Sequence, residues 1–355
     1  MTSQKGQKIY DAHMHVEYDI QLEEGLENFR KRMEGKHIRG GTVLAAPIDD
    51  KRNYIASPVE NVSALYYKET LPGIFTAFAG FEGHSDDPDY YLNFAKHAME
   101  MGFDGFKSLL GLPYNRKLAG KGVNHPSFEK FFAYLEAEGL PFTLHTGNPA
   151  IYWDLENAPE AAKRLGRVYD SSYLTLDELY QEAESLLERH PKLHITFAHF
   201  LFMGDNHDRL KKLMDTYENI TLDLAPAAEV FADMANAIPL WKEFFITYQH
   251  RILFGSDTYV AYPTLNTPLA DAVCNFLETT GPYTCRHNGL VIPGLDLDVP
   301  VLKNICWDNA IRLRKRNPLN KEKIVAECQR ILRESDSLIG HDRENLEIII
   351  RDFSK

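Results

Sequence analysis

Residues 8–16 read Lys-Ile-Tyr-Asp-Ala-His-Met-His-Val, a short apolar stretch with polar side chains at alternate positions. It is the first of eight such runs, and the segments between them have helical periodicity. This alternation is typical of parallel β/α units, and eight units favour closure into a (β/α)8 TIM barrel of the α/β class, with an open doubly wound sheet as the alternative. The runs are 8–16, 38–47, 74–81, 102–110, 141–147, 194–200, 220–225 and 252–258.

The connecting segments carry helix start and stop signals. Residues 127–139 begin with Ser and end with Gly, and residues 176–190 and 208–217 show a similar helical pattern before the next run. Each of these segments therefore predicts a helix that crosses from one parallel strand to the next.

The length and order of these elements predict one domain over residues 1–355. We expect the barrel at about residues 8–316 and a charged helical tail at about 317–355 that packs outside it. Longer inserts follow the fifth run, at residues 148–174, and the seventh, at residues 226–250. Because loops at the carboxyl ends of barrel strands build active sites, the first insert is a candidate lid.

The composition narrows the function. A formal charge of -12 argues against nucleic acid or an anionic membrane surface as the main partner, because an acidic field repels phosphate. The N-terminus has no apolar targeting stretch and the chain has no run long enough to span a bilayer, so we expect a cytoplasmic protein. The four cysteines lack CxxC spacing, and reduced, mostly buried thiols are the simplest interpretation.

Potential metal ligands gather at the ends of the runs. In the first run, Asp11, His13 and His15 are two residues apart and are expected to point the same way. Alone, this pattern fits a hydrogen-bonded polar cluster or an exposed strand edge equally well. However, the fifth, sixth and eighth runs each close on one polar residue, respectively His145, His199 and Asp257. In a closed parallel barrel these ends meet at one face, which predicts a metal site there.

This ordered set resembles the amidohydrolase superfamily, in particular the amidohydrolase-2 branch that contains lactone and amide hydrolases and aminocarboxymuconate-semialdehyde-type decarboxylases. The resemblance extends from Asp-Ala-His-Met-His at residues 11–15, through Phe-Gly-Ser-Asp at 254–257, to Trp-Asp-Asn-Ala-Ile-Arg-Leu at 307–313. It implies a metal-dependent TIM-barrel enzyme and makes a homodimer plausible.

The resemblance also assigns roles. It implies that the metal ligands are His13, His15, His145 and Asp257, and that His199 lies beside the metal, where it polarises substrate, positions water or binds a second ion. Lys107 matches the position at which binuclear members carry a carboxylated lysine. We favour an unmodified lysine that pairs with Asp11 or another acid, or binds an anionic substrate.

Three imidazoles and a carboxylate suit Zn²⁺, although Mn²⁺, Fe²⁺ or Co²⁺ can occupy the same ligands. The leading hypothesis is a metal-dependent hydrolase acting on a small carboxylated lactone or amide, with Asp257 transferring the proton of an activated water and His199 stabilising the oxyanion. Nonoxidative decarboxylation of an aromatic or unsaturated carboxylic acid is the enzymatic alternative. A metal-binding barrel without catalysis is the alternative of another class.

Several weaker candidates concern the substrate, which we expect to be a small anion. The segment 112–121 is basic, and Arg116 within it is a candidate anion ligand, although an ordinary solvated loop is the slightly better interpretation. Aromatic residues near the strand ends could form a wall for a ring, and two further residues follow the third run. The aromatic residues are Tyr152, Trp153, Tyr259 and Tyr262, and the two others are Glu82 and His84.

Overall fold

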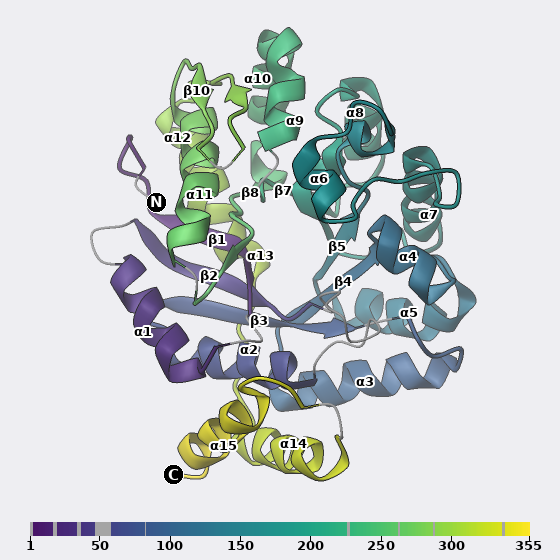
Figure 1. Ribbon diagram of the computed structural model, residues 1–355, viewed down its shortest axis with the longest axis vertical. Helices are drawn as coiled ribbons and strands as arrows, with labels where there is room; N and C mark the ends of the chain where they lie inside the picture. The colour runs from purple at the N-terminus through teal and green to yellow at the C-terminus, as the bar shows by residue number, and fades with distance from the viewer. Residues whose placement is uncertain are drawn as a thin grey trace.

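The computed structural model describes residues 3–16, 20–33, 37–46, 58–81, 83–225, 228–261, 263–286, 288–335 and 338–355. Its main sheet is parallel, with the strand order β8-β7-β6-β5-β4-β3-β2-β1-β9 and helices around it (Figure 1). The strands follow the eight apolar runs, so the predicted TIM barrel is confirmed. They are β1 (Ile9–His15), β2 (Ile38–Leu44), β3 (Ile74–Phe81), β4 (Gly105–Gly111), β5 (Phe142–Thr146), β6 (Ile195–Phe197), β7 (Ile220–Asp223), β8 (Ile252–Leu253) and β9 (Thr258–Tyr259).

The eighth run closes the barrel in two pieces rather than as one strand. β8 pairs with β7, whereas β9 pairs with β1 through Met14 and Thr258. Between them the chain stays beside β1, because the Ala12 amide donates to the Phe254 carbonyl at 2.8 Å. Asp257 ends this irregular stretch with a φ of 50°, so the strand is interrupted where a site residue was predicted.

The predicted crossover helices are present. The segment 127–139 forms a 3-10 turn and α5, and Gly139 ends α5 in the left-handed region. Thr175 and Glu178 form a capping box at the start of α7. The helices are α1 (Leu22–Met33), α2 (Pro58–Thr70), α3 (Pro88–Met101), α4 (Pro113–Ala119), α5 (Glu129–Glu138), α6 (Glu160–Arg164), α7 (Leu176–Arg189), α8 (His207–Thr216), α9 (Ala228–Asp233), α10 (Ile238–Thr247), α11 (Pro263–Glu278), α12 (Val299–Lys303), α13 (Asn309–Leu313), α14 (Lys321–Glu334) and α15 (Asp342–Phe353).

The main apolar core lies between the sheet and the surrounding helices, where strand residues such as Phe75 and Phe142 pack on helical residues such as Phe29 and Phe132. All four cysteines are buried and free, as the sequence predicted. A small antiparallel pair, β10 (Tyr283–Thr284) with β11 (Val291–Ile292), follows α11 and was not predicted.

The C-terminal tail forms α14 and α15, which lie outside the barrel against α2 and α3 (Figure 1). The Tyr66 hydroxyl of α2 donates to Asp352 at 3.2 Å, and Glu327 of α14 lies 3.4 Å from His97 of α3. These contacts place the tail against the outer helices, so it supports the barrel wall.

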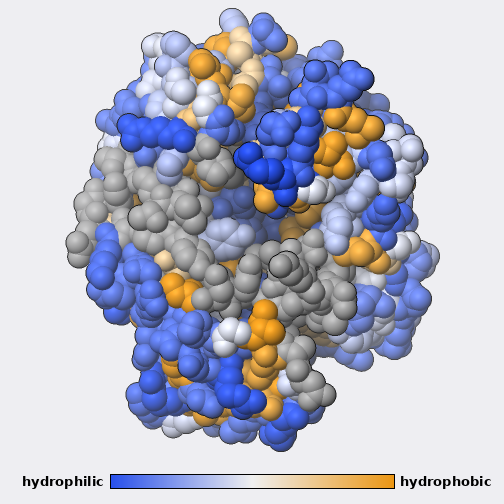
Figure 2. Space-filling model, in the orientation of Figure 1, coloured by the Kyte–Doolittle hydropathy of each residue, from blue (hydrophilic) through white to orange (hydrophobic). Residues whose placement is uncertain are grey.

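The described helices lack the combination of length and apolar character that a membrane-spanning segment needs. Hydrophilic side chains dominate the face drawn in Figure 2, which is hollowed near its centre.

A buried ion pair joins α2 to the start of β4 and to the segment after α13. Lys68 and Asp104 are 2 % and 3 % exposed, and the Lys68 ammonium donates to the Asp104 carboxylate at 2.8 Å and to the carbonyls of Gly102 and Asn317. Asp104 also accepts the Ala77 amide at 2.8 Å. Because buried charges need partners, this network links three parts of the barrel wall.

We predict that Lys68→Met lowers the free energy of unfolding by about 3–5 kcal/mol, because it leaves a buried carboxylate without its counter-ion. Denaturant unfolding followed by circular dichroism measures the change. Lys323→Met, which breaks the exposed pair of Lys323 with Glu100, is the matched control and should cost less than about 1 kcal/mol. Equal losses in the two variants would contradict the structural role of the buried pair.

Candidate metal centre

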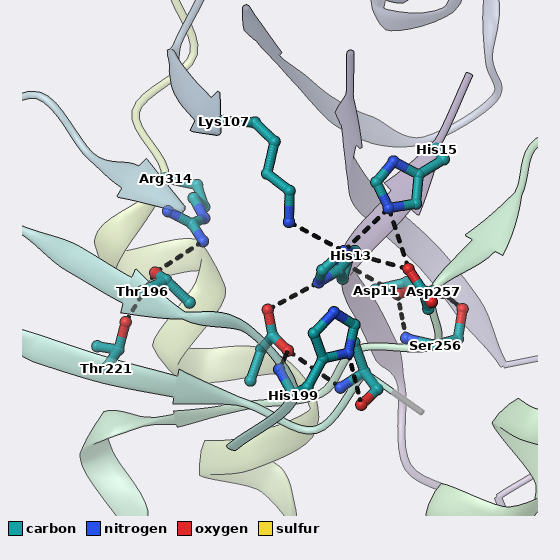
Figure 3. Close-up of polar contacts among 12 residues, drawn as sticks. Asp11, His13, His15, Lys107, Thr196, His199, Thr221, Ser256, Asp257 and Arg314 are labelled. Carbon is teal, nitrogen blue, oxygen red and sulfur yellow. Dashed lines mark hydrogen bonds and ion pairs between the residues drawn. The ribbon is translucent and has the colours of Figure 1, made fainter. Parts of the chain in front are cut away.

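His13 and His15 of β1 and Asp257, which precedes β9, form a compact cluster at the carboxyl ends of the strands (Figure 3). The Nε2 atoms of the two histidines are 3.1 Å apart, and Asp257 Oδ1 lies 3.0 Å from His15 Nε2 and 3.3 Å from His13 Nε2. One ligand atom from each residue lies within 4.8 Å of the others, and within the described part of the chain these three residues are the group that meets this geometry.

Asp11 does not join this cluster. The pairing of β1 with β2 shifts register between Asp11 and Met14, so strict alternation along the strand does not carry Asp11 to the side of His13 and His15. Its carboxylate instead accepts the Ser256 amide at 3.0 Å and the His13 amide at 3.2 Å, and it also accepts the Ser256 hydroxyl. Asp11 therefore holds the irregular stretch before Asp257 against β1.

Asp223, at the end of β7, is a residue of this centre that the sequence analysis missed. It is fully buried, and its carboxylate accepts a hydrogen bond from His13 Nδ1 at 2.9 Å. The amides of His199 and Ala225 donate to its other oxygen at 2.9 and 3.1 Å. The signal was available, because the run Ile-Thr-Leu-Asp ends on a carboxylate just as the other runs end on a ligand.

The surroundings of His13 and Asp257 favour the protonation states in which these residues can bind a metal. Burial, with a contribution from Lys107, lowers the pKa of His13 to about 3, so its ring is neutral at pH 7. Since Nδ1 carries the proton donated to Asp223, His13 Nε2 presents a lone pair toward His15 and Asp257. Burial acts to raise the pKa of Asp257, but the hydrogen bond with His15 and the adjacent His13 and His199 hold it well below its usual range.

Lys107 of β4 points into the barrel toward this cluster (Figure 3). It is fully buried, and its Nζ lies 3.3 Å from His13 Nε2. Burial lowers the pKa of Lys107 to about 8, against the opposing charges of Asp223 and Asp257. The expected pairing with Asp11 is not what the structure shows, because the Asp11 carboxylate faces Ser256; the neighbour of the ammonium is the His13 ring.

His145 and His199 lie beside each other in the same pocket, with ring centroids 4.5 Å apart, but their nitrogens fall outside the three-residue group. His145 Nε2 lies 2.9 Å from the Gly147 carbonyl, which assigns its proton to Nε2 and leaves Nδ1 as an acceptor. His199 Nδ1 lies 3.4 Å from the Ala225 carbonyl, so its Nε2 is the acceptor. Burial lowers the pKa of both histidines, and both rings are neutral.

The cluster opens into a pocket of about 530 Å³ whose wall combines rings with a few polar groups. Asp257 forms part of the floor, and its side chain is 32 % exposed whereas that of His13 is fully buried. The insert after β5 covers one side with Tyr152, Tyr169 and Arg167, as expected of a candidate lid. Tyr259 closes the opposite side beside His15, at 5.7 Å between ring centroids.

Asn115 and Arg167 are among the lining residues that were not predicted. Asn115 is completely buried, and its amide nitrogen and oxygen have no hydrogen-bond partner among the described residues. Arg167 is exposed on the insert and lines the pocket without an ion-pair partner in the described part of the chain. Neither residue belongs to a periodic pattern, so the sequence carried no signal for them.

The basic segment 112–121 contributes differently from the expectation. It forms α4 rather than a loop, and the Arg116 guanidinium binds the Glu182 carboxylate through Nε and Nη2 at 2.8 to 3.0 Å instead of lining the pocket. Lys117 donates to the Ser172 hydroxyl at 2.7 Å, and Lys121 donates to the Ser85 carbonyl at 2.8 Å. Each of these cations therefore has a partner close to it in space. The partners lie far away in the sequence, so the local sequence could not predict the contacts.

The remaining weak candidates lie at the margin. Trp153 donates from Nε1 to the Leu174 carbonyl at 3.0 Å and packs on Tyr169, so it supports the insert rather than lining the pocket. His84 is exposed and contacts the Tyr90 ring. Glu82 and Tyr262 lie outside the described residues.

The donor set fits a divalent metal. Two imidazole nitrogens and a carboxylate oxygen converge on one point, which suits a borderline cation such as Zn²⁺. His15 Nδ1 is buried and has no hydrogen-bond partner among the described residues, so the polar cluster is not complete by itself. His13 is held in the metal-binding tautomer by a carboxylate, the usual arrangement around a metal-ligating histidine.

A parallel barrel with a histidine and carboxylate centre at its carboxyl face defines the class of metal-dependent TIM-barrel enzymes. The chain belongs to the amidohydrolase family, because the family model described as Amidohydrolase matches residues 10–314. This confirms the resemblance inferred from the histidine and aspartate pattern. No curated protein matches the sequence.

Solved structures with the same fold are distant in sequence. An uncharacterized TIM-barrel protein from Bordetella bronchiseptica is 14% identical with a TM-score of 0.53, covering 86% of this chain and 98% of that one. A 2,6-dihydroxybenzoate decarboxylase from Rhizobium is 16% identical with a TM-score of 0.50, covering 86% and 98%. At these identities the likeness concerns the fold.

We predict that Asp223→Asn weakens divalent metal binding by roughly 10–100-fold, because the carboxylate that fixes the tautomer of His13 is lost. Competition with a chromophoric chelator measures the affinity, with the ion count checked by elemental analysis. Asp215→Asn removes a carboxylate that binds Lys211 and Tyr248 on the surface and should leave the affinity unchanged. An unchanged affinity in Asp223→Asn would contradict the role of this carboxylate in metal binding.

Proposed function

We propose that the protein is a metal-dependent hydrolase that acts on a small carboxylated lactone or amide. The observation that carries the proposal is the position of Asp257. Its carboxylate lies within 3.3 Å of both histidine nitrogens, yet it is partly exposed at the floor of the pocket, where a substrate can meet it.

His13, His15 and Asp257 would hold the metal, with His145 next to them in the pocket. When bound, a divalent ion polarises a carbonyl oxygen and lowers the pKa of water, with Zn²⁺ the first choice and Mn²⁺, Fe²⁺ or Co²⁺ as alternatives. The buried position of His13 and its bond to Asp223 preorganise the ligands for this purpose.

The protonation state of Asp257 suits a general base in hydrolysis. Its pKa lies well below the usual range, so the resting carboxylate is ionised and ready to accept a proton from an attacking water. It would then deliver that proton to the leaving group.

His199 supports the same reaction. It lies next to His13, at 5.1 Å between ring centroids, and its Nε2 is free to accept a hydrogen bond because Nδ1 faces the Ala225 carbonyl. An acceptor beside the cluster orients a water for attack. This assignment favours the positioning of water over the donation of a hydrogen bond to an oxyanion.

The pocket wall suits a small anion with a ring. Arg167 offers a guanidinium for a carboxylate, and the buried Asn115 amide offers an unpaired donor and acceptor. The rings of Tyr152, Tyr169 and Tyr259 provide apolar faces around them. The substrate class we propose is therefore a small carboxylated ring or chain with a hydrolysable ester or amide bond.

A nonoxidative decarboxylase is the second candidate, because a 2,6-dihydroxybenzoate decarboxylase shares the fold over 86% of the chain. The two reactions release different products. Incubation of the metal-loaded enzyme with carboxylated lactones and amides and with aromatic carboxylic acids, followed by acid titration and CO₂ detection, separates them.

We expect acid release from a lactone or amide without CO₂, and a decrease of kcat by roughly 10²–10⁴-fold in Asp257→Asn with metal still bound. Elemental analysis verifies the metal content of the variant. Full turnover by metal-loaded Asp257→Asn, or CO₂ as the only product, would overturn the proposal.

We predict that Arg167→Met raises KM roughly 10–100-fold for the carboxylated substrate and leaves kcat nearly unchanged, because it removes a charge-assisted contact far from the reacting bond. Lys163→Met, which removes a cation of the same insert that pairs with Glu160, is the matched control. Steady-state kinetics on the substrate and on its uncharged ester distinguish the effect. With the uncharged ester as substrate, the wild type and Arg167→Met should have the same KM.

A further inference from the structure

A second cavity lies at the opposite end of the barrel, below the amino ends of the strands. Its volume is about 410 Å³, and it is formed by the segment after α13 together with the starts of β4, β6 and β7. Arg314, Thr196 and Thr221 line it and form a connected group away from the metal centre (Figure 3). The proposed reaction uses none of these residues.

Arg314 is the unusual residue of this cavity. It is 7 % exposed, and a guanidinium remains charged in proteins even when it is buried. One face lies over the Phe78 ring, with Cζ 4.6 Å from the ring centroid. At its edge, Nη2 reaches the Thr196 hydroxyl at 3.3 Å, whereas Nε is buried and has no hydrogen-bond partner among the described residues. The Arg314 guanidinium therefore has a single side-chain hydrogen bond among the described residues, and its acceptor, the Thr196 hydroxyl, is uncharged.

The nearest carboxylates are committed elsewhere. Asp104 accepts hydrogen bonds from Lys68, Ala77 and Asn317. Asp223 lies toward the metal centre, where His13 donates to it. Within the described ranges, no carboxylate lies at ion-pair distance from Arg314, although isolated buried charges are normally paired.

The rest of the cavity adds positive charge. Lys315 and Arg312 line it from the same segment, and Lys315 makes no ion pair with another described residue. Arg312 donates to the His250 carbonyl, which leaves its charge uncompensated. Among the described residues, two acidic ones line the cavity, Asp104 and Glu138. Asp104 is paired with Lys68, so Glu138 is the lining acid outside that pair. A cationic cavity stands out in a chain with a formal charge of -12.

We propose that this cavity binds a small oxyanion of the phosphate or carboxylate class, with Arg314 as its buried cation and Lys315 at the rim. The guanidinium lines the cavity, is held in place by the Phe78 ring and has no carboxylate partner among the described residues, and guanidinium groups are preferred partners of phosphate and carboxylate. The hydroxyl groups of Thr196 and Thr221, 2.8 Å apart, lie within the same wall, and since one donates to the other, at most one of them can donate to the anion.

Thermal unfolding of the full chain at constant ionic strength tests the proposal, with sodium phosphate or sodium acetate replacing sodium chloride. We expect a saturable rise of the midpoint with phosphate, acetate or both. A response to both anions identifies a general oxyanion site, and a response to one identifies its class. In Arg314→Met the half-saturating concentration should increase roughly tenfold or more.

Two controls separate this cavity from other sites. Arg330→Met removes a surface arginine that pairs with Glu327 and Glu334 and should keep the full response. His13→Ala should also keep it, because an anion held at the metal centre would lose its site in that variant. If Arg314→Met does not fold, Lys315→Gln and Thr196→Val provide the same comparison. No saturable shift in the wild type, or an equal shift in the Arg314 or Lys315 and Thr196 variants, would overturn the proposal.

Discussion

The carboxylate of Asp223 is sealed inside the barrel, and it must therefore find its hydrogen-bond donors there. It finds one in the His13 ring at 2.9 Å and two in the backbone amides of His199 and Ala225. The first bond sets the tautomer of His13 and turns Nε2 toward His15 and Asp257. The others tie the end of β6 to the end of β7, so one buried charge organises three strand ends.

Local strain is concentrated around the same centre. The residues from His199 to Phe202 have φ values of 56, 55, 55 and 51°, and none of them is glycine. Left-handed backbone costs roughly 1–2 kcal/mol for each such residue, so tertiary contacts must maintain this turn. Tyr180 donates to the Leu201 carbonyl at 2.7 Å, and Phe200 stacks on Phe245 at 5.4 Å. The turn places the His199 ring in the pocket, stacked on Phe202.

Much of this arrangement could be predicted because it follows from periodicity and topology. Alternation along β1 turns His13 and His15 to one side, and parallel strands bring their carboxyl ends together, which places Asp257 beside them. The same alternation failed for Asp11, since a register shift is a local irregularity without a pattern in the sequence. Asp223 could have been predicted from its strand-end position.

The substrate side of the pocket was less predictable for a different reason. Arg116 pairs with Glu182, which lies 66 residues further along the chain, so its commitment depends on how α4 packs against α7. Arg167 and Asn115 reach the pocket from an irregular insert and a short helix, where no repeat dictates the direction of a side chain. Residues of this kind require the tertiary structure, because nothing in their local sequence separates them from solvated neighbours.

Both ends of the barrel hold polar groups that a bound ion would stabilise, a cation at the carboxyl end and an anion at the amino end. At the carboxyl face, the nitrogens of His13 and His15 and the ionised carboxylate of Asp257 meet at a common point, an arrangement that a cation stabilises. At the amino face, the edge of Arg314 directs donors into a cavity lined by further cations, an arrangement that an oxyanion stabilises. Asp223 lies between the two ends, because it accepts a hydrogen bond from His13 on one side and its charge acts on Arg314 on the other.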